Sequence, residues 1–142
     1  DLDHFKPVND LYGHAMGDRL LQQVAQRMQA LLRRTDSVGR VGGDEFMLLL
    51  TDISVFEDAL HVAEKIRQAL LEPFVIEGKT LFISSCIGLA FYPDHGQSLH
   101  DICRQADHAM YLAKQAGRNA VRQYEPAASL VDGFVAMGPS PT

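Results

Sequence analysis

Two adjacent acidic residues in a turn-like stretch are the most chemically distinctive feature of this chain. Apolar runs flank the stretch, and glycine reaches the positive φ values that tight turns demand, so the pattern predicts a β-hairpin with the acids at its tip. Adjacent carboxylates repel each other unless a cation or a proton lies between them. The pair therefore indicates a site for a hard divalent cation, and a solvated acidic turn is the competing explanation. The four residues of the stretch are Gly42, Gly43, Asp44 and Glu45.

Two further acids stand at the start of the chain. Asp1 and Asp3 lie in an alternating stretch that predicts the end of a β-strand whose beginning would lie upstream. Side chains two residues apart in a strand point to the same face. If this strand lies beside the hairpin, one of the two carboxylates joins Asp44 and Glu45 around a shared Mg²⁺, which prefers carboxylate oxygens and commonly bridges to substrate phosphates.

An amide and a carboxylate, Asn9 and Asp18, lie in the polar segment that follows. Both residue types are common helix caps, so capping explains them without any ligand. The functional hypothesis is purine recognition, because a carboxylate accepts hydrogen bonds from the N1–H and N2 amino groups of guanine, and an amide both donates and accepts. Adenine would leave that carboxylate unpaired, so such a pair would reject ATP.

Three cations could hold phosphate groups. Lys114 and Arg118 lie at the end of a helical pattern, where cations also suit the helix dipole without any ligand. Lys6 lies close to the N-terminal acids in the sequence. Together the three side chains could clamp a triphosphate, with Arg118 offering the planar fork that suits phosphate oxygens.

Arg33 and Asp36 lie three residues apart, just before the hairpin. Such a pair is usually a surface ion pair worth less than about 1 kcal/mol. A guanidinium with a carboxylate also matches a guanine nucleotide, with the arginine on phosphate or purine and the aspartate on the base edge. Spacing alone leaves both interpretations open.

Hydrophobic periodicity predicts the elements that would position these residues. One-sided apolar stripes at helical spacing predict helices, and short apolar runs between turn residues predict strands, most of them in hairpins. Hairpin-linked strands interrupted by helices indicate an α/β (α+β) sandwich with a mainly antiparallel central sheet flanked by helices. The predicted helices span residues 18–33, 55–71 and 98–115, and the predicted strands span 1–5, 38–41, 46–50, 75–76, 81–92 and 120–124.

Composition limits what the chain can be. With 142 residues and 46% hydrophobic content it can bury one core, so we expect a single domain over residues 1–125 and a linker or disordered tail over 126–142. The net charge of −5, without a basic block, argues against binding a nucleic-acid polymer. No apolar run approaches the roughly 20 residues of a membrane span. We expect a soluble, cytoplasmic segment, which a longer protein could still anchor to a membrane through an upstream region.

The ordered series of motifs closely resembles the GGDEF family of diguanylate cyclases. The resemblance implies a palm-like fold similar to adenylyl cyclases and polymerases. It also implies that two GTP molecules, one on each subunit of a two-fold dimer, condense to cyclic di-GMP with loss of two pyrophosphates. It spans about residues 1–125 and rests on residues 1–6, Asn9-Asp10, Gly13-His14, Gly17-Asp18, the Gly-Gly-Asp-Glu-Phe hairpin, and Lys114 with Gly117 and Arg118.

The resemblance also implies roles for individual positions. Asp1 and Glu45 would ligate Mg²⁺ or Mn²⁺ with help from the Leu2 carbonyl. Asp44 would assist deprotonation of the 3′-hydroxyl group near the metal, and Asn9 and Asp18 would read guanine. The implied substrate-binding positions are Lys6, Asn9, His14, Asp18, Gly42, Gly43, Lys114 and Arg118, and the implied inhibitory Arg-x-x-Asp site for the product is Arg33 with Asp36.

The leading hypothesis is therefore a GTP-dependent diguanylate cyclase that acts as a homodimer and is inhibited by its product. Each subunit would bring one nucleotide, so only a dimer could align the two. The alternative is a non-catalytic module that senses GTP or cyclic di-GMP and regulates a neighbouring domain. The intact pair of Asp44 and Glu45 favours the enzyme.

Overall fold

A computed structural model describes residues 1–125 and the backbone of residues 133–137. The helices are α1 (Phe5–Tyr12), α2 (His14–Gln29), α3 (Phe56–Leu71) and α4 (Leu99–Gln115). The strands are β1 (Leu2–Asp3), β2 (Ser37–Gly42), β3 (Glu45–Leu49), β4 (Phe74–Ile76), β5 (Lys79–Leu81), β6 (Ser84–Phe91), β7 (Ala120–Gln123) and β8 (Gly133–Met137).

The main sheet has the strand order β1-β6-β8-β3-β2, and β7 also pairs with β6. Its strand pairs are antiparallel except for β6 with β7. Both β1 and β8 run antiparallel to β6, with Leu2 opposite Ser85 and Met137 opposite Ile87. A separate antiparallel pair is formed by β4 and β5. The predicted α/β sandwich with a mainly antiparallel sheet is confirmed.

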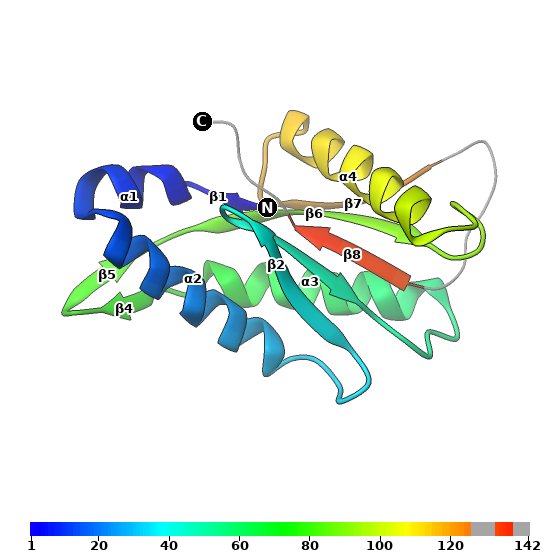
Figure 1. The fold of residues 1–142 in the computed structure, drawn as a ribbon, viewed down its shortest axis with the longest axis horizontal. Helices are drawn as coiled ribbons and strands as arrows, with labels where there is room; N and C mark the ends of the chain where they lie inside the picture. Colours follow the sequence, from blue (N-terminus) through cyan, green and yellow to red (C-terminus); the bar gives the residue numbers. More distant parts are fainter. Residues whose placement is uncertain (126–132, 138–142) are drawn as a thin grey trace.

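The main sheet lies between two helical layers (Figure 1). One face carries α4, and the other is covered by α2 and α3. Every residue of β6 is buried between these layers. At Gly88 of this strand an added Cβ would lie 2.0 Å from the Ala106 carbonyl oxygen. Glycine at this position therefore lets α4 sit directly on the strand.

The larger hydrophobic cluster fills the space between the sheet and the two helices α2 and α3. The apolar stripes that predict these helices supply its side chains. Burying one such side chain stabilises the fold by roughly 1.5–3 kcal/mol. Fully buried examples are Leu20, Val24 and Met28 of α2 and Ile66 and Leu70 of α3.

The observed helices differ from the expectation near the N-terminus. The periodicity does not predict α1, a short helix that buries Phe5 and Val8. The helix predicted over residues 18–33 spans His14–Gln29 instead. It begins after Gly13, whose φ of 91° separates it from α1, and it ends before Ala30. The run predicted as one strand over residues 81–92 is divided between β5 and β6.

The C-terminal region differs most from the expectation. Residues 133–137, predicted as part of a linker or disordered tail, form β8 in the middle of the main sheet. This strand pairs with β3 on one side and β6 on the other, so it provides hydrogen-bonding partners for both. The tail prediction is wrong at β8. Residues 126–132 and 138–142 lie outside the described part of the chain, and the prediction remains untested for them.

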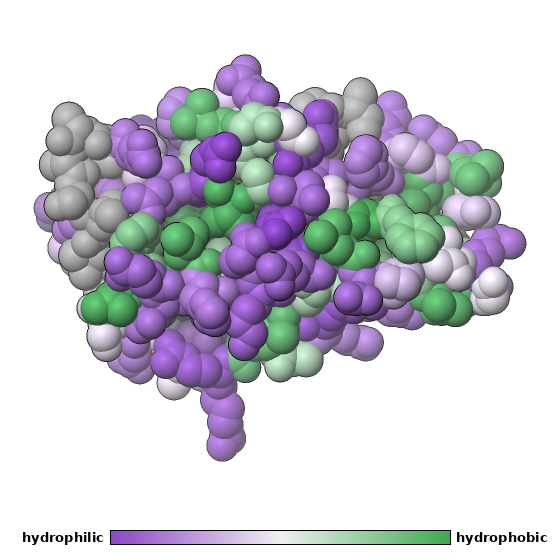
Figure 2. Space-filling view, turned by 180° about the vertical axis from the view of Figure 1, so that it is seen from behind, coloured by the Kyte–Doolittle hydropathy of each residue, from purple (hydrophilic) through white to green (hydrophobic). Residues whose placement is uncertain are grey.

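Among the described helices, none combines the length and the hydrophobicity needed to cross a membrane. Figure 2 shows that hydrophilic residues cover most of the face opposite to the view of Figure 1, with small groups of hydrophobic residues between them. Scattered exposed apolar residues of this kind are normal for a globular domain.

Candidate active site

The β2–β3 hairpin places its two acids in different positions. Gly42 pairs with Glu45, which leaves Gly43 and Asp44 as the turn. Gly43 has a φ of 53°, a left-handed conformation that glycine adopts without strain. Arg40 braces the turn, since its Nε donates to the Gly43 carbonyl oxygen at 2.6 Å. Asp44 is therefore at the tip, whereas Glu45 is the first residue of β3, and both are half-buried.

Burial raises the pKa of both acids. For Asp44, desolvation is the largest cause, and the Asp3 carboxylate raises the pKa further. For Glu45, desolvation again comes first, followed by repulsion from Asp107 of α4. Because the charged forms of these carboxylates are disfavoured, a cation bound beside them would lower their free energy.

Asp1 is fully buried beside β6. Its backbone nitrogen donates to the Cys86 carbonyl oxygen at 2.8 Å, and its carbonyl oxygen accepts from the Cys86 N–H at 2.7 Å. Both side-chain oxygens of Asp1 are buried and accept no hydrogen bond from the described residues. The Lys114 ammonium forms an ion pair with Oδ2, which leaves Oδ1 without a partner in the described part of the chain. A buried carboxylate with unused acceptor positions suits a cation site.

Asp3 is also fully buried, but both of its carboxylate oxygens already have partners within the fold. Spacing alone does not decide which of the first two acids would join a metal, and the hydrogen bonds favour Asp1. The contacts of Asp3 are Ser84 Oγ (2.6 Å) and the Asn119 N–H (3.0 Å) on Oδ2, and Cys86 Sγ (3.2 Å) and Arg118 Nε (3.9 Å) on Oδ1.

A divalent metal ion fits the chemistry of this donor set. Within residues 1–125, no three His, Cys, Asp or Glu side chains stand close enough together to hold a metal by themselves. Mg²⁺ is usually bound through one or two carboxylates together with substrate phosphates. Asp1 and Glu45 could supply the carboxylates and Leu2 a carbonyl oxygen. Ligation by these three residues remains a prediction.

Asn9 packs directly against α2. A Cβ at Gly17 would lie 1.8 Å from the Asn9 Oδ1 atom. The same oxygen is buried and has no hydrogen-bond partner in the described part of the chain. Asn9 lies inside α1 and Asp18 lies inside α2, and neither helix has a side-chain cap, so the capping explanation is excluded for both. Asn9 keeps an unused acceptor that a purine amino group could fill.

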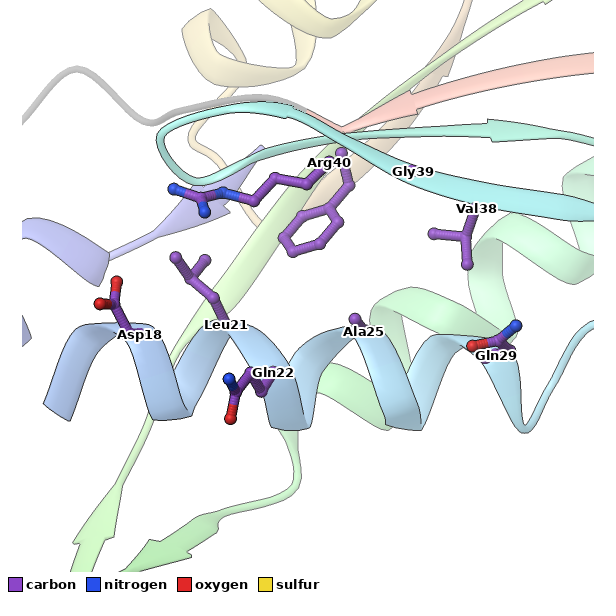
Figure 3. Close-up of a pocket in the computed structure, with 9 residues that line it drawn as sticks. Asp18, Leu21, Gln22, Ala25, Gln29, Val38, Gly39 and Arg40 are labelled. Carbon is purple, nitrogen blue, oxygen red and sulfur yellow. The ribbon is translucent and has the colours of Figure 1, made fainter. Parts of the chain in front are cut away.

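A pocket of about 460 Å³ lies between α2 and β2 (Figure 3). Its volume falls within the roughly 300–1,000 Å³ typical of small-molecule sites. Figure 3 shows the Asp18 carboxylate pointing across the gap toward the Arg40 guanidinium. Leu21 and Phe46 add apolar lining, and Gln22 adds a polar group one turn beyond Asp18. This combination of apolar and polar lining residues suits a planar base with polar edges.

The predicted phosphate-binding cations lie around β1. Lys114 pairs with Asp1, and burial, followed by repulsion from Arg118, lowers the Lys114 pKa. Lys6 is exposed in the first turn of α1, a helix whose N-terminus has no side-chain cap and therefore favours an anion. His14 is not part of this group, because it begins α2 and lies one turn from Asp18.

Arg33 and Asp36 form the ion pair that their spacing predicts, with 3.5 Å between Nε and Oδ2. The Asp36 side chain is 3% exposed and accepts from the N–H groups of Arg33, at 2.9 Å, and Thr51, at 3.2 Å. The Arg33 side chain is 58% exposed, although its guanidinium also donates to the Thr51 carbonyl oxygen. Asp36 therefore stabilises the loop, and the guanidinium remains accessible to an anionic ligand.

Residues 1–120 match the sequence profile of the family described as diguanylate cyclase, GGDEF domain. This chain belongs to that family. Over 125 residues the GGDEF domain is 46% identical to MucR of Pseudomonas aeruginosa, named a bifunctional diguanylate cyclase/cyclic di-GMP phosphodiesterase, and the match covers 88% of this chain and 18% of MucR. The chain thus spans less than a fifth of that relative's length.

Solved structures have the same fold. The GGDEF domain of TpbB from Pseudomonas aeruginosa superimposes with a TM-score of 0.86 and 40% identity, covering 89% of this chain and 79% of that one. The GGDEF domain of DgcB from Caulobacter crescentus, solved in complex with c-di-GMP, gives a TM-score of 0.74 and 27% identity, covering 89% and 75% of the two chains.

Sequence reasoning misses several residues that support the site of this GGDEF domain. Ser84 and Cys86 lie inside an apolar run that indicates only a buried strand. Burial, followed by the contact with Asp3, raises the pKa of Cys86 to about 12, so the thiol stays protonated and acts as a donor. The sequence gives no signal for Asp107, because its effect on Glu45 depends on the fold bringing both residues to one pocket.

Proposed function

We propose that this GGDEF domain condenses two GTP molecules into cyclic di-GMP and two pyrophosphates, with one GTP on each subunit of a homodimer. The observation that carries the proposal is the convergence of three segments distant in sequence. The charge on Asp44 of the hairpin interacts with that of Asp3 in β1, and Lys114 of α4 pairs with Asp1. This convergence joins a proton acceptor, carboxylates suited to a metal, and cations suited to phosphates.

The reaction needs a deprotonated 3′-hydroxyl group aligned with an α-phosphorus. A bound Mg²⁺ or Mn²⁺ supplies charge neutralisation at the attacking and leaving oxygens. Asp1, Glu45 and the Leu2 carbonyl would hold this ion. Asp44 would accept the 3′-hydroxyl proton as the general base.

Binding and orientation of GTP fall to the surrounding residues. Lys6, Lys114 and Arg118 would hold the phosphates, and the open backbone of Gly42 and Gly43 would allow the nucleotide to approach the hairpin closely. Asn9 and Asp18 would read the guanine edge in and beside the pocket of Figure 3. An isologous dimer would place the two half-sites face to face, so that each 3′-oxygen meets the other nucleotide's phosphate.

The proposal is tested by incubating the purified protein with GTP and Mg²⁺ and measuring cyclic di-GMP and pyrophosphate by mass spectrometry. Cyclic di-GMP should accumulate with GTP, and no cyclic product should form with ATP. At protein concentrations where monomers and dimers coexist, the initial rate should rise more than linearly with protein concentration. Absence of product at every protein concentration would reject the enzymatic proposal. Calorimetric binding of GTP without turnover would then favour the alternative, a nucleotide-sensing module.

We also propose that cyclic di-GMP inhibits the enzyme at Arg33 and Asp36. Arg33→Ala should weaken inhibition by roughly tenfold or more, the usual effect of losing a charge-assisted hydrogen bond, while the rate measured without added product stays the same. The measurement is a titration of initial rates with cyclic di-GMP. Arg34→Ala, which removes a neighbouring exposed cation, is the matched control. Unchanged inhibition in Arg33→Ala would exclude this site.

A further inference from the structure

The turn between α4 and β7 has an unusual backbone. Three of its four residues have a positive φ: 113° at Gly117, 65° at Arg118 and 44° at Asn119. Residues other than glycine in this region cost roughly 1–3 kcal/mol each and persist when surrounding contacts fix them. The turn carries Arg118, so whatever fixes the backbone also fixes the point from which that side chain extends.

On the inner side, the turn is held by Asp3 and by the end of α4. The Asn119 N–H donates to Asp3 Oδ2 at 3.0 Å, and the Arg118 N–H donates to the Ala113 carbonyl oxygen at 3.1 Å. Asp3 is itself immobilised because the Ser84 hydroxyl donates to the same oxygen at 2.6 Å. These contacts join the turn to β1 and β6.

On the outer side, the turn is held by α3. Arg67 donates from a terminal nitrogen to the Asn119 Oδ1 atom at 2.7 Å. Its Nε donates to both carboxylate oxygens of Glu64 at 3.0 Å, so Glu64 orients the guanidinium toward the turn. Hydrogen bonding between these two side chains lowers the pKa of Glu64 and raises the pKa of Arg67. The Arg67 side chain is 17% exposed, whereas its partners Glu64, at 42%, and Asn119 are more exposed.

We propose that Glu64 and Arg67 are positioning residues for the phosphate-binding turn. They act through Asn119 and hold Arg118 where it can contact a triphosphate, without touching the nucleotide themselves. The inference rests on the proposed function in assuming that Arg118 binds phosphate. Loss of Arg67 should therefore weaken triphosphate binding much more than it slows the chemical step.

A double-mutant cycle tests this proposal. Asn119→Gly deletes the side-chain acceptor while still allowing the positive φ, and Arg67→Ala deletes the donor. Each variant should bind a non-hydrolysable GTP analogue with Mg²⁺ roughly fivefold more weakly by calorimetry. The double variant should bind about as weakly as either single one, because the two residues act through one contact. Where turnover is measurable, KM for GTP should rise by the same factor and kcat should change less than twofold.

Lys65→Ala is the matched control, because it removes an exposed cation from the same helix. It should leave both binding and turnover unchanged. Amide hydrogen exchange at Asn119 adds a readout independent of nucleotide, and Arg67→Ala should accelerate it. Unchanged analogue affinity in Arg67→Ala, or single-variant effects that multiply in the double variant, would overturn the proposal.

The two proposals can fail separately. A wild-type protein that binds the analogue but forms no cyclic di-GMP would contradict the proposed enzyme, while the affinity cycle would still decide the role of Arg67. Conversely, a wild-type protein that forms cyclic di-GMP, together with an Arg67→Ala variant of unchanged affinity, would retain the enzyme and reject the positioning role.

Discussion

Glu45→Gln should lower the rate of cyclic di-GMP formation by more than about a hundredfold. Even residues that only orient a metal ligand change metal affinity or activity by roughly 10- to 100-fold, so removing a proposed ligand should cost more. The amide has nearly the same size, and Glu45 is half-buried at the start of β3, so the fold should persist. Initial rates at saturating GTP, measured over a range of Mg²⁺ concentrations, would show the loss.

The same substitution should stabilise the protein in metal-free buffer at neutral pH. Burial raises the pKa of Glu45 in the folded state, and repulsion from Asp107 adds to it. As pH rises from the ordinary glutamate pKa through this raised value, the unfolded chain loses the proton first, and the folded state becomes less stable. Glutamine removes this penalty. Urea unfolding should therefore show Glu45→Gln gaining stability over wild type at neutral pH, and the gain should vanish in acid.

Opposite effects on activity and stability are the signature of a residue kept for function. Glu125→Gln, at an exposed position beyond β7, is the control and should change neither quantity appreciably. If Glu45→Gln retained more than a tenth of the wild-type rate, a metal-ligand role for this residue would be untenable. A loss of stability that is the same at every pH would instead indicate that Glu45 serves packing.

Gly88→Ala should destabilise the domain by about 1–3 kcal/mol, the usual cost of overpacking a well-filled interior. Its Cβ would lie 2.0 Å from the Ala106 carbonyl oxygen and 2.4 Å from the Met110 nitrogen. Both atoms belong to the backbone of α4, so no side-chain rotation can relieve the contact. The helix must move away from β6, and the Lys114 side chain near its end moves with it.

Chemical unfolding in urea, followed by circular dichroism, would measure the effect. Gly39→Ala is the matched control, because it lies in β2 of the same sheet and its added Cβ would meet no atom within 4 Å. It should stay within about 0.5 kcal/mol of wild type. Equal stability of Gly88→Ala and Gly39→Ala would mean that α4 does not rest on β6 as closely as described.

The long amphipathic elements are predictable because their patterns are local. The apolar stripes of α3 and α4 reflect burial against one sheet, and the hairpin follows from two glycines. In contrast, α1 buries only two side chains, too few for a stripe, and β8 is a short run whose strand character depends on the neighbouring strands β3 and β6. Elements that depend on contacts with neighbouring elements are therefore hard to predict from their own residues.

The candidate site likewise has some features that are predictable from the local sequence and others that depend on distant residues. Residue type and order predict site roles for Asp44, Glu45 and Lys114, and the structure brings these three residues to one end of the sheet. Spacing alone cannot distinguish the roles of Asp1 and Asp3, because both are buried acids on one strand face. The difference lies in the hydrogen bonds that Asp3 accepts from Ser84 and Asn119, which are 81 and 116 residues away.

Those sequence separations also bear on how the site comes into being during folding. Closing a loop of this length costs more chain entropy than forming a hairpin or a helix, and contacts between distant residues tend to form late. A folding intermediate in which β2 and β3 have paired but β1 has not joined β6 would display Asp44 and Glu45 without Asp1 or a fixed Arg118. Nucleotide-dependent chemistry would therefore be confined to molecules that have completed folding, and partly folded chains would be inactive.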